Sequence, residues 1–175
     1  MPAADRELLE RPINLFRALA NNVGALRQWQ AFSDWIRWNG TIDPRQRELA
    51  ILQVGLSTRS AYEVTHHVEL ARGFGVTDAD LDDLARLAAG QPARQLSAAD
   101  LAVVNAAREM AQTGDLAPAG WAALVEAAGQ PGAVEFVVVI GFYGAVTQVL
   151  SALQIDVEPE YESHLAFFRE ATPAP

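Results

Sequence analysis

The chain contains no cysteine among its 175 residues. Disulfide bonds, thiolate metal sites and catalysis by a thiol are therefore excluded. The sequence also lacks a run of basic residues, and its formal net charge is -9. Because binding to a phosphate backbone requires clustered Lys and Arg, nucleic acid is not an expected partner.

Targeting and membrane signals are also missing. The N-terminal twelve residues contain no apolar stretch behind a positive segment, so no secretory signal is seen and a cytoplasmic location is expected. The uncharged run from Phe136 to Ile155 is long enough to suggest a membrane helix. Gly, Thr, Gln and Ser residues interrupt this run and no basic flank anchors it. We therefore predict a central buried helix and no membrane association.

The sequence does contain a series of helix signals. Hydrophobic residues make up 50% of the chain, which argues against disorder and predicts one domain with a substantial core. N-cap residues, prolines at first helical positions and terminal glycines delimit the helical patterns, and no convincing strand emerges. We predict an all-α domain of about seven or eight helices over residues 13–155. Residues 1–12 are expected to form a loose arm, and residues 156–175 an acidic tail with a short helix over Glu160 to Glu170.

One predicted helix begins at Asp43-Pro44 and carries a glutamate in apolar surroundings. An N-cap residue followed by proline at the first helical position is a typical helix start. At ~100° per residue, apolar side chains surround Glu48 on nearly all sides, as in a buried helix. A buried carboxylate needs a partner, so we expect Glu48 to be paired.

The next predicted helix begins near Ser60 and ends at the glycines of 73–75. Its periodicity places Glu63 and His67 four residues apart at the edge of the inward face, close enough to share a proton or a hydrogen bond. His66 points about 100° away and is expected to face water. Ser60 and Glu63 also fit a capping box, in which their side chains would serve only the first backbone N–H groups of the helix. The sequence leaves both interpretations of these two residues open.

Three segments of the chain carry a resemblance to a known family. They are RELAIL at Arg47 to Leu52, YEVTHHVELARGFGV at Tyr62 to Val76, and GFYGAVTQVLSALQI at Gly141 to Ile155. The chain resembles the carboxymuconolactone decarboxylase family, which includes the alkylhydroperoxidase D-type proteins. The resemblance covers most of the chain and implies an alkylhydroperoxidase D-like helical fold.

The hydroperoxidase branch of that family carries a glutamate, then a C-x-x-C pair, then a histidine four residues after the second cysteine. In this sequence Glu48 takes the place of the glutamate and His67 that of the histidine. Ser60 and Glu63 stand where the two cysteines would be. Because both thiols are missing, the resemblance implies the decarboxylase-like branch and disfavours a thiol peroxidase.

The resemblance implies a cofactor-free lyase or isomerase that works by acid/base catalysis. Its expected substrate is a small, anionic lactone or enolisable carbonyl compound. In this interpretation His67 transfers the proton, Glu48 orients the imidazole and stabilises its charged form, and Glu63 supplies a second carboxylate. No metal is expected, because the histidine pair at 66–67 does not fit the H-E-x-x-H arrangement. The alternative is a non-catalytic binding or assembly protein with the same fold.

Three further side chains are candidates for holding a substrate. Arg47 could bind a carboxylate through a two-pronged hydrogen bond, although no sequence feature favours it over Arg59. Ser60 and Tyr143 each offer a hydroxyl group. For Tyr143 the alternative is an ordinary position in the core.

An aromatic stripe of Phe32, Trp35 and Trp38 follows one side of the predicted helix over residues 25–38. Such a stripe is expected in the core or at a subunit contact, and the alternative is that it lines a pocket. The resemblance implies a homo-oligomer, either a trimer or a hexamer. The Trp29–Trp38 and Gly141–Ala145 segments are the candidate contacts, since interfaces favour aromatic residues.

Overall fold

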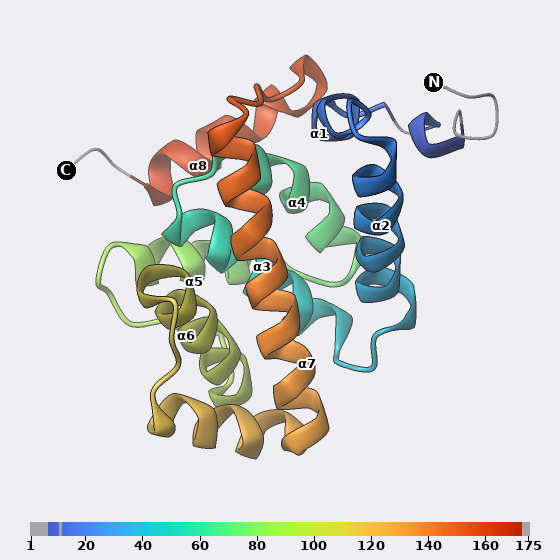
Figure 1. The fold of residues 1–175 in the computed structure, drawn as a ribbon. Coiled ribbons are helices and arrows are strands. Elements are labelled where there is room, and N and C mark those ends of the chain that lie inside the picture. Colours follow the sequence, from blue (N-terminus) through green and yellow to red (C-terminus); the bar gives the residue numbers. More distant parts are fainter. Residues whose placement is uncertain (1–6, 11, 173–175) are drawn as a thin grey trace.

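The computed structural model describes residues 7–10 and 12–172 (Figure 1). Its α-helices are α1 (Asn14–Leu19), α2 (Val23–Asp34), α3 (Pro44–Ser57), α4 (Ala61–Gly73), α5 (Asp78–Ala88), α6 (Ala98–Thr113), α7 (Pro118–Ala152) and α8 (Leu165–Ala171). A π-helix, η2 (Trp35–Asn39), continues α2, and a 3-10 helix, η3 (Pro159–His164), precedes α8. The described residues form no β-strand, so the predicted all-α class is confirmed.

Local side-chain chemistry sets several helix boundaries as the sequence predicts. At the start of α3 the Asp43 side chain accepts a hydrogen bond from the backbone N–H of Gln46. At the start of α6, Ser97 and Asp100 form a full capping box. Helix α6 ends at Gly114, whose φ of 75° is a left-handed conformation that suits glycine.

Helix α3 occupies the centre of the fold. Every residue from Arg47 to Leu56 is buried, and α3 packs against α4, α6 and α7 (Figure 1). With neighbours on all sides, the helix needs no polar stripe. Its polar residues Arg47, Glu48 and Gln53 must therefore find partners inside the protein.

Helix α7 is the longest element and is sharply bent. Gly129 has φ 68° and ψ 166°, which lie outside the helical region, so the helix consists of two rods. Figure 1 shows the first rod along the bottom and the second rising through the middle of the molecule. By length and composition α7 is the one described helix that could cross a membrane. Its packing against α3 and α6 is that of a core helix.

The segment after α7 folds back over α4. Helix η3 contacts α4, and α8 packs against α4 and α5. These two elements correspond to the short helix predicted over residues 160–170. Most of the predicted N-terminal arm lies outside the described residues, and its residues 7–10 border the pocket described below.

The aromatic stripe lies at the surface and not in the core. Phe32 and Trp35 are 37% and 38% exposed, and their rings stack with centroids 5.7 Å apart. Phe32 also meets the edge of Phe142 on α7, and Val134 and Val138 of the same helix are exposed. We call Phe32, Trp35, Phe142, Val134 and Val138 the apolar face. Its role as a subunit contact stays a prediction.

We expect Gly55→Ala to destabilise the fold, because Gly55 lets α3 and α4 approach closely. An added Cβ would lie 2.8 Å from Cγ2 of Val64 and 3.3 Å from its backbone N. Overpacking of this kind costs about 1–3 kcal/mol and should lower the Tm by several degrees. The matched control is Gly73→Ala, where no atom lies within 4 Å of the added Cβ. Thermal melts that show the same Tm for Gly55→Ala and wild type would contradict this packing.

Candidate active site

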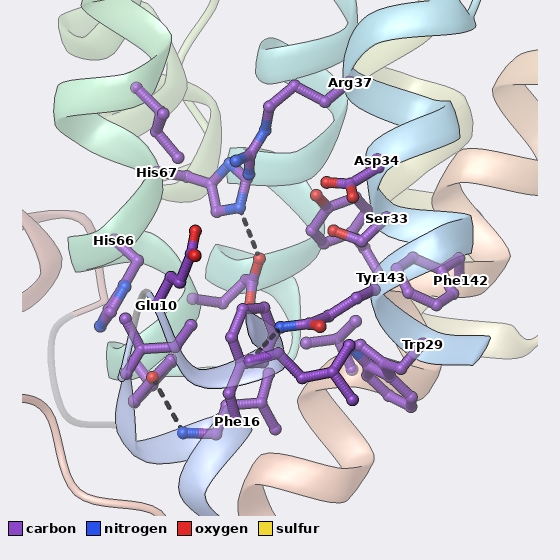
Figure 2. Close-up of a pocket in the computed structure, with 18 of the residues that line it drawn as sticks. Glu10, Phe16, Trp29, Ser33, Asp34, Arg37, His66, His67, Phe142 and Tyr143 are labelled. Atoms are coloured by element: carbon purple, nitrogen blue, oxygen red, sulfur yellow. Dashed lines mark hydrogen bonds and ion pairs between the residues drawn. The ribbon is translucent and has the colours of Figure 1, made fainter. Parts of the chain in front are cut away.

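A pocket of about 360 Å³ opens beside α4 (Figure 2). It lies between α1, α2, α4 and α7, with residues 7–10 at one edge. The volume is within the usual range of ligand pockets, roughly 300–1,000 Å³. One part of the wall is apolar and aromatic, and another is polar and carries Glu63 and His67, two of the residues predicted to be catalytic.

The imidazole of His67 lies between two carboxylates. Its Nδ1 is 2.7 Å from Oε2 of Glu48, and its Nε2 is 3.0 Å from Oε1 of Glu63. The contact with Glu63 is an ion pair of poor hydrogen-bond alignment, because Oε1 of Glu63 has no hydrogen-bond partner among the described residues. The structure thus brings together the three residues that the sequence proposed as catalytic.

Arg47 lies behind Glu48 and does not line the pocket. Its Nε and Nη2 donate to Oε1 of Glu48 at 3.1 and 3.0 Å. Its Nη1 donates to the backbone oxygens of Ile36 and Arg37 at 3.4 and 3.1 Å. The guanidinium also lies 4.5 Å from the ring centroid of Phe74. Arg47 is therefore placed as a buried counter-charge, away from the position that a substrate carboxylate would need.

These contacts set the charge of the site. Burial would lower the pKa of His67, but the negative charges of Glu63 and Glu48 outweigh burial and raise the pKa to about 9. Burial would raise the pKa of Glu48, but His67 and Arg47 outweigh it and lower the pKa. At neutral pH His67 is thus an imidazolium whose two N–H groups face carboxylates. The described residues contain no group of three or more His, Cys, Asp and Glu side chains arranged to hold a metal ion.

Tyr143 of α7 forms the wall next to His67. The two rings meet edge to face, with centroids 5.2 Å apart and an interplanar angle of 87°. Burial, together with the charges of Glu63 and Glu48, raises the pKa of the Tyr143 hydroxyl, so the group stays protonated. Within residues 7–10 and 12–172 this hydroxyl has no hydrogen-bond partner. It is therefore available to donate to a ligand.

Residues 24–109 match the sequence profile of the Carboxymuconolactone decarboxylase family. This part of the chain, just under half of its length, therefore resembles members of that family. The matched segment contains Glu48, Glu63 and His67 and ends before the helix that carries Tyr143. Among curated proteins, none has a significant sequence match.

Two solved structures resemble the chain along most of their length. A variant of the debrominase Bmp8, in complex with 2,3,4-tribromopyrrole, superimposes with a TM-score of 0.78 at 14% identity, over 96% of this chain and 95% of that one. An uncharacterized peroxidase-related protein from Silicibacter sp. TM1040 has a TM-score of 0.71 at 17% identity, over 90% and 84% of the two chains. At these identities the likeness shows the alkylhydroperoxidase D-like fold alone.

The structure separates Ser60 from Glu63, which stand where the cysteines of the hydroperoxidase branch of the family would be. The Ser60 hydroxyl accepts a hydrogen bond from the backbone N–H of Glu63 at 3.4 Å, so it caps α4. The Glu63 side chain turns to His67 and does not return to the backbone of Ser60. Only half of the capping box is formed. Ser60 borders a separate hollow near Thr147 and does not line the pocket.

The expectation that His66 faces water is wrong. His66 is 5% exposed, and its Nε2 lies 2.6 Å from Oε2 of Glu158. Its ring lies between those of Tyr62 and Tyr161, with centroids 4.1 and 3.8 Å away. Burial lowers the pKa of His66, although Glu158 opposes this shift. The segment after α7 packs over this side of α4. Helical periodicity does not predict which distant segment packs on a given face of a helix, so the sequence could not indicate that His66 is buried.

Arg37 is a pocket residue that the sequence did not indicate. It lies in η2, half-buried, and its side chain extends toward His67 in Figure 2. The sequence predicts an ordinary helix through residue 38, whereas the structure has a π-helix from Trp35 to Asn39. π-Helical turns are rare and often occur at functional sites. Hydrophobic spacing does not distinguish them from a regular helix.

We expect the histidines at the pocket to titrate in opposite directions from an ordinary value near 6.5. The pKa of His67 should be about 9, and that of His66 should lie below the ordinary value. Glu63→Gln removes a charge that favours the imidazolium and should lower the pKa of His67, while Ser60→Ala should leave it unchanged. An NMR titration of the histidine ring signals measures all of these values.

The same shift links pH to stability. Because folding raises the pKa of His67, its contribution to the free energy of unfolding is complete below pH ~6.5 and is lost as the pH rises through its folded pKa. Denaturant melts of wild type and Glu63→Gln should therefore converge toward alkaline pH. A pKa near 6.5 for His67 in wild type would contradict the placement of its imidazole between Glu48 and Glu63.

Proposed function

We propose that this protein is a cofactor-free acid/base enzyme of the decarboxylase-like branch of that family, acting on a small enolisable carbonyl compound such as a lactone. The main support is the imidazolium of His67, which is held between Glu48 and Glu63 in the wall of a pocket of ligand size. A charged imidazole at a cavity can donate a proton, and the carboxylates fix its orientation. A pair that only satisfied the core would not need the open volume.

In the proposed reaction His67 is the general acid. Loss of carbon dioxide breaks a C–C bond and leaves the electron pair on the substrate carbonyl as an enolate. Nε2 of His67 then gives its proton to carbon, and the neutral imidazole takes a proton back from water, whose hydroxide combines with the released carbon dioxide as bicarbonate. Glu48 retains the hydrogen bond to Nδ1 and stabilises the charged form. An isomerisation would use the same groups, with Glu63 removing the first proton and His67 returning one to a different carbon.

The enolate oxygen needs hydrogen-bond donors in a site that excludes water. The Tyr143 hydroxyl is protonated and lies in the wall beside His67, so it suits this role. The chain has no lysine, so no side-chain amine can form a Schiff base with the carbonyl group. Stabilisation of the enolate falls to the charges and hydrogen bonds of the pocket.

The names of the structural neighbours lend limited support. Reduction of a peroxide by the thiol route requires a thiolate, and this chain has no cysteine, so the peroxidase-related neighbour is not a guide to its chemistry. The debrominase structure contains 2,3,4-tribromopyrrole, a small ring. A small ring is also the size of ligand that a pocket of about 360 Å³ suits.

We expect His67→Asn to lower turnover by about 10²–10⁴-fold, which is the usual contribution of a positioned acid or base. The Tm should change by only a few degrees, because Glu48 keeps Arg47 as a partner. His164→Asn is the matched control, since His164 does not line the pocket. The measurement is a screen of unsaturated lactones and their carboxylates, followed by assays and melts of both variants. Equal activity of His67→Asn and wild type would favour the non-catalytic alternative.

We also propose that the protein forms a homo-oligomer, as the resemblance implies, through its apolar face. Several large apolar side chains are exposed on this face, and such side chains often mark a protein contact. Trp35→Glu, which introduces a charge into the face, should shift the mass measured by light scattering toward that of a monomer. Leu153→Glu changes a residue that is 52% exposed at the end of α7, outside the face, and should leave the mass unchanged. A wild-type protein that is monomeric at micromolar concentration would remove this proposal.

A further inference from the structure

The pocket contains a cation that the acid/base chemistry above does not use. Arg37 lines the pocket, and its guanidinium has no hydrogen bond or ion pair within residues 7–10 and 12–172. By contrast, Arg45, Arg47 and Arg72 are all paired with carboxylates. A half-buried guanidinium without a partner gains most from an anionic ligand, because part of its hydration is already lost.

The backbone that carries Arg37 is held firmly, although the side chain has no partner among the described residues. The backbone oxygens of Ile36 and Arg37 accept hydrogen bonds from Arg47, which also binds Glu48. Just after η2, the carboxylate of Glu135 accepts a hydrogen bond from the backbone N–H of Thr41 at 2.8 Å. The π-helix is thus connected to the ion cluster of Arg47, Glu48, His67 and Glu63, which orients the imidazole. Because the backbone at Arg37 is fixed in this way, only the side chain has to become ordered when a ligand binds, which limits the entropic cost of binding.

The carboxylates at the rim do not neutralise Arg37. Glu7, Glu10 and Asp34 border the pocket, but all three are exposed and none forms an ion pair with the Arg37 guanidinium. Exposed charges are screened by solvent and salt, whereas a charge inside the pocket is screened much less. A ligand carboxylate that enters the pocket therefore interacts mainly with Arg37, because both N–H groups of His67 already face the carboxylates of Glu48 and Glu63.

The geometry points to Arg37 as the residue that determines specificity in this pocket, by binding a ligand carboxylate through its two parallel N–H groups. The ring of such a ligand would lie on the aromatic part of the wall, which Phe16, Trp29 and Phe142 provide. Arginine matches a carboxylate in this two-pronged manner better than lysine does. The inference rests on the proposed function, since it assigns the anchor for the substrate of the same site.

The carboxylate that Arg37 binds is one that does not leave. A carboxylate that departs as carbon dioxide loses its charge, so an ion pair with it would stabilise the ground state more than the transition state and slow the reaction. The substrate of a decarboxylation at this site would therefore carry a second, unreacting carboxylate. A substrate that is only isomerised would need a single carboxylate, the one that binds Arg37.

Benzoate and benzamide test this inference, because they have nearly the same size and differ in charge. Calorimetry should show that wild type binds benzoate roughly 10- to 100-fold more tightly than benzamide, as expected for hydrogen bonds to a charged group. Arg37→Gln should abolish this preference and leave benzamide binding unchanged, which also shows that the pocket is intact. Arg37→Lys keeps the positive charge but loses the two parallel N–H donors, so it should retain part of the preference for benzoate. Arg94→Gln, which removes an exposed arginine outside the pocket, should retain all of it.

Wild type that binds neither probe, or binds both alike, would overturn the inference. A benzoate preference that survives in Arg37→Gln would do the same, because His67 would then be its source. Failure of the proposed function has a different signature. In that case His67→Asn would leave turnover unchanged, while the benzoate preference and its dependence on Arg37 would persist.

Discussion

The buried carboxylate of Glu48 is the constraint on which the site depends. Glu48 is 1% exposed in the central helix, and a charge at such a depth is stable only when partners compensate it. His67 and Arg47 share this task. Each partner then fixes another part of the site, since His67 brings Glu63 to the pocket and Arg47 holds the backbone of η2. One ion cluster thereby connects three helical elements.

Differences in their carboxylate partners explain why the pKa values of the adjacent histidines shift in opposite directions. His67 has two carboxylate partners, and their combined charge outweighs the cost of burial. His66 has Glu158 as its close carboxylate partner, and burial dominates there. The residue type and the helix are the same for both side chains. The number and distance of the carboxylates that tertiary packing supplies make the difference.

The pocket depends on rigid elements that approach one another closely. Gly55 allows α3 and α4 to pack at short range, which places Glu48 within hydrogen-bonding distance of His67. The bend of α7 at Gly129 directs its second rod through the middle of the fold, where it supplies Tyr143 to the wall. Side chains held on helices in this way keep their geometry better than side chains on loops.

The sequence by itself determined most of the α-helices, several of their caps and the pairing of Glu63 with His67, because all of these depend on spacings of about one helical turn. It also showed that Glu48 needs a buried partner, and the resemblance indicated the fold. Only the tertiary structure decided that His66 is buried, since its partner Glu158 lies 92 residues further along the chain. The same holds for Arg37, because hydrogen bonds from Arg47 support the π-helix that presents it. Local spacing decides which side chains of one helix can meet, whereas packing decides what covers each face of that helix.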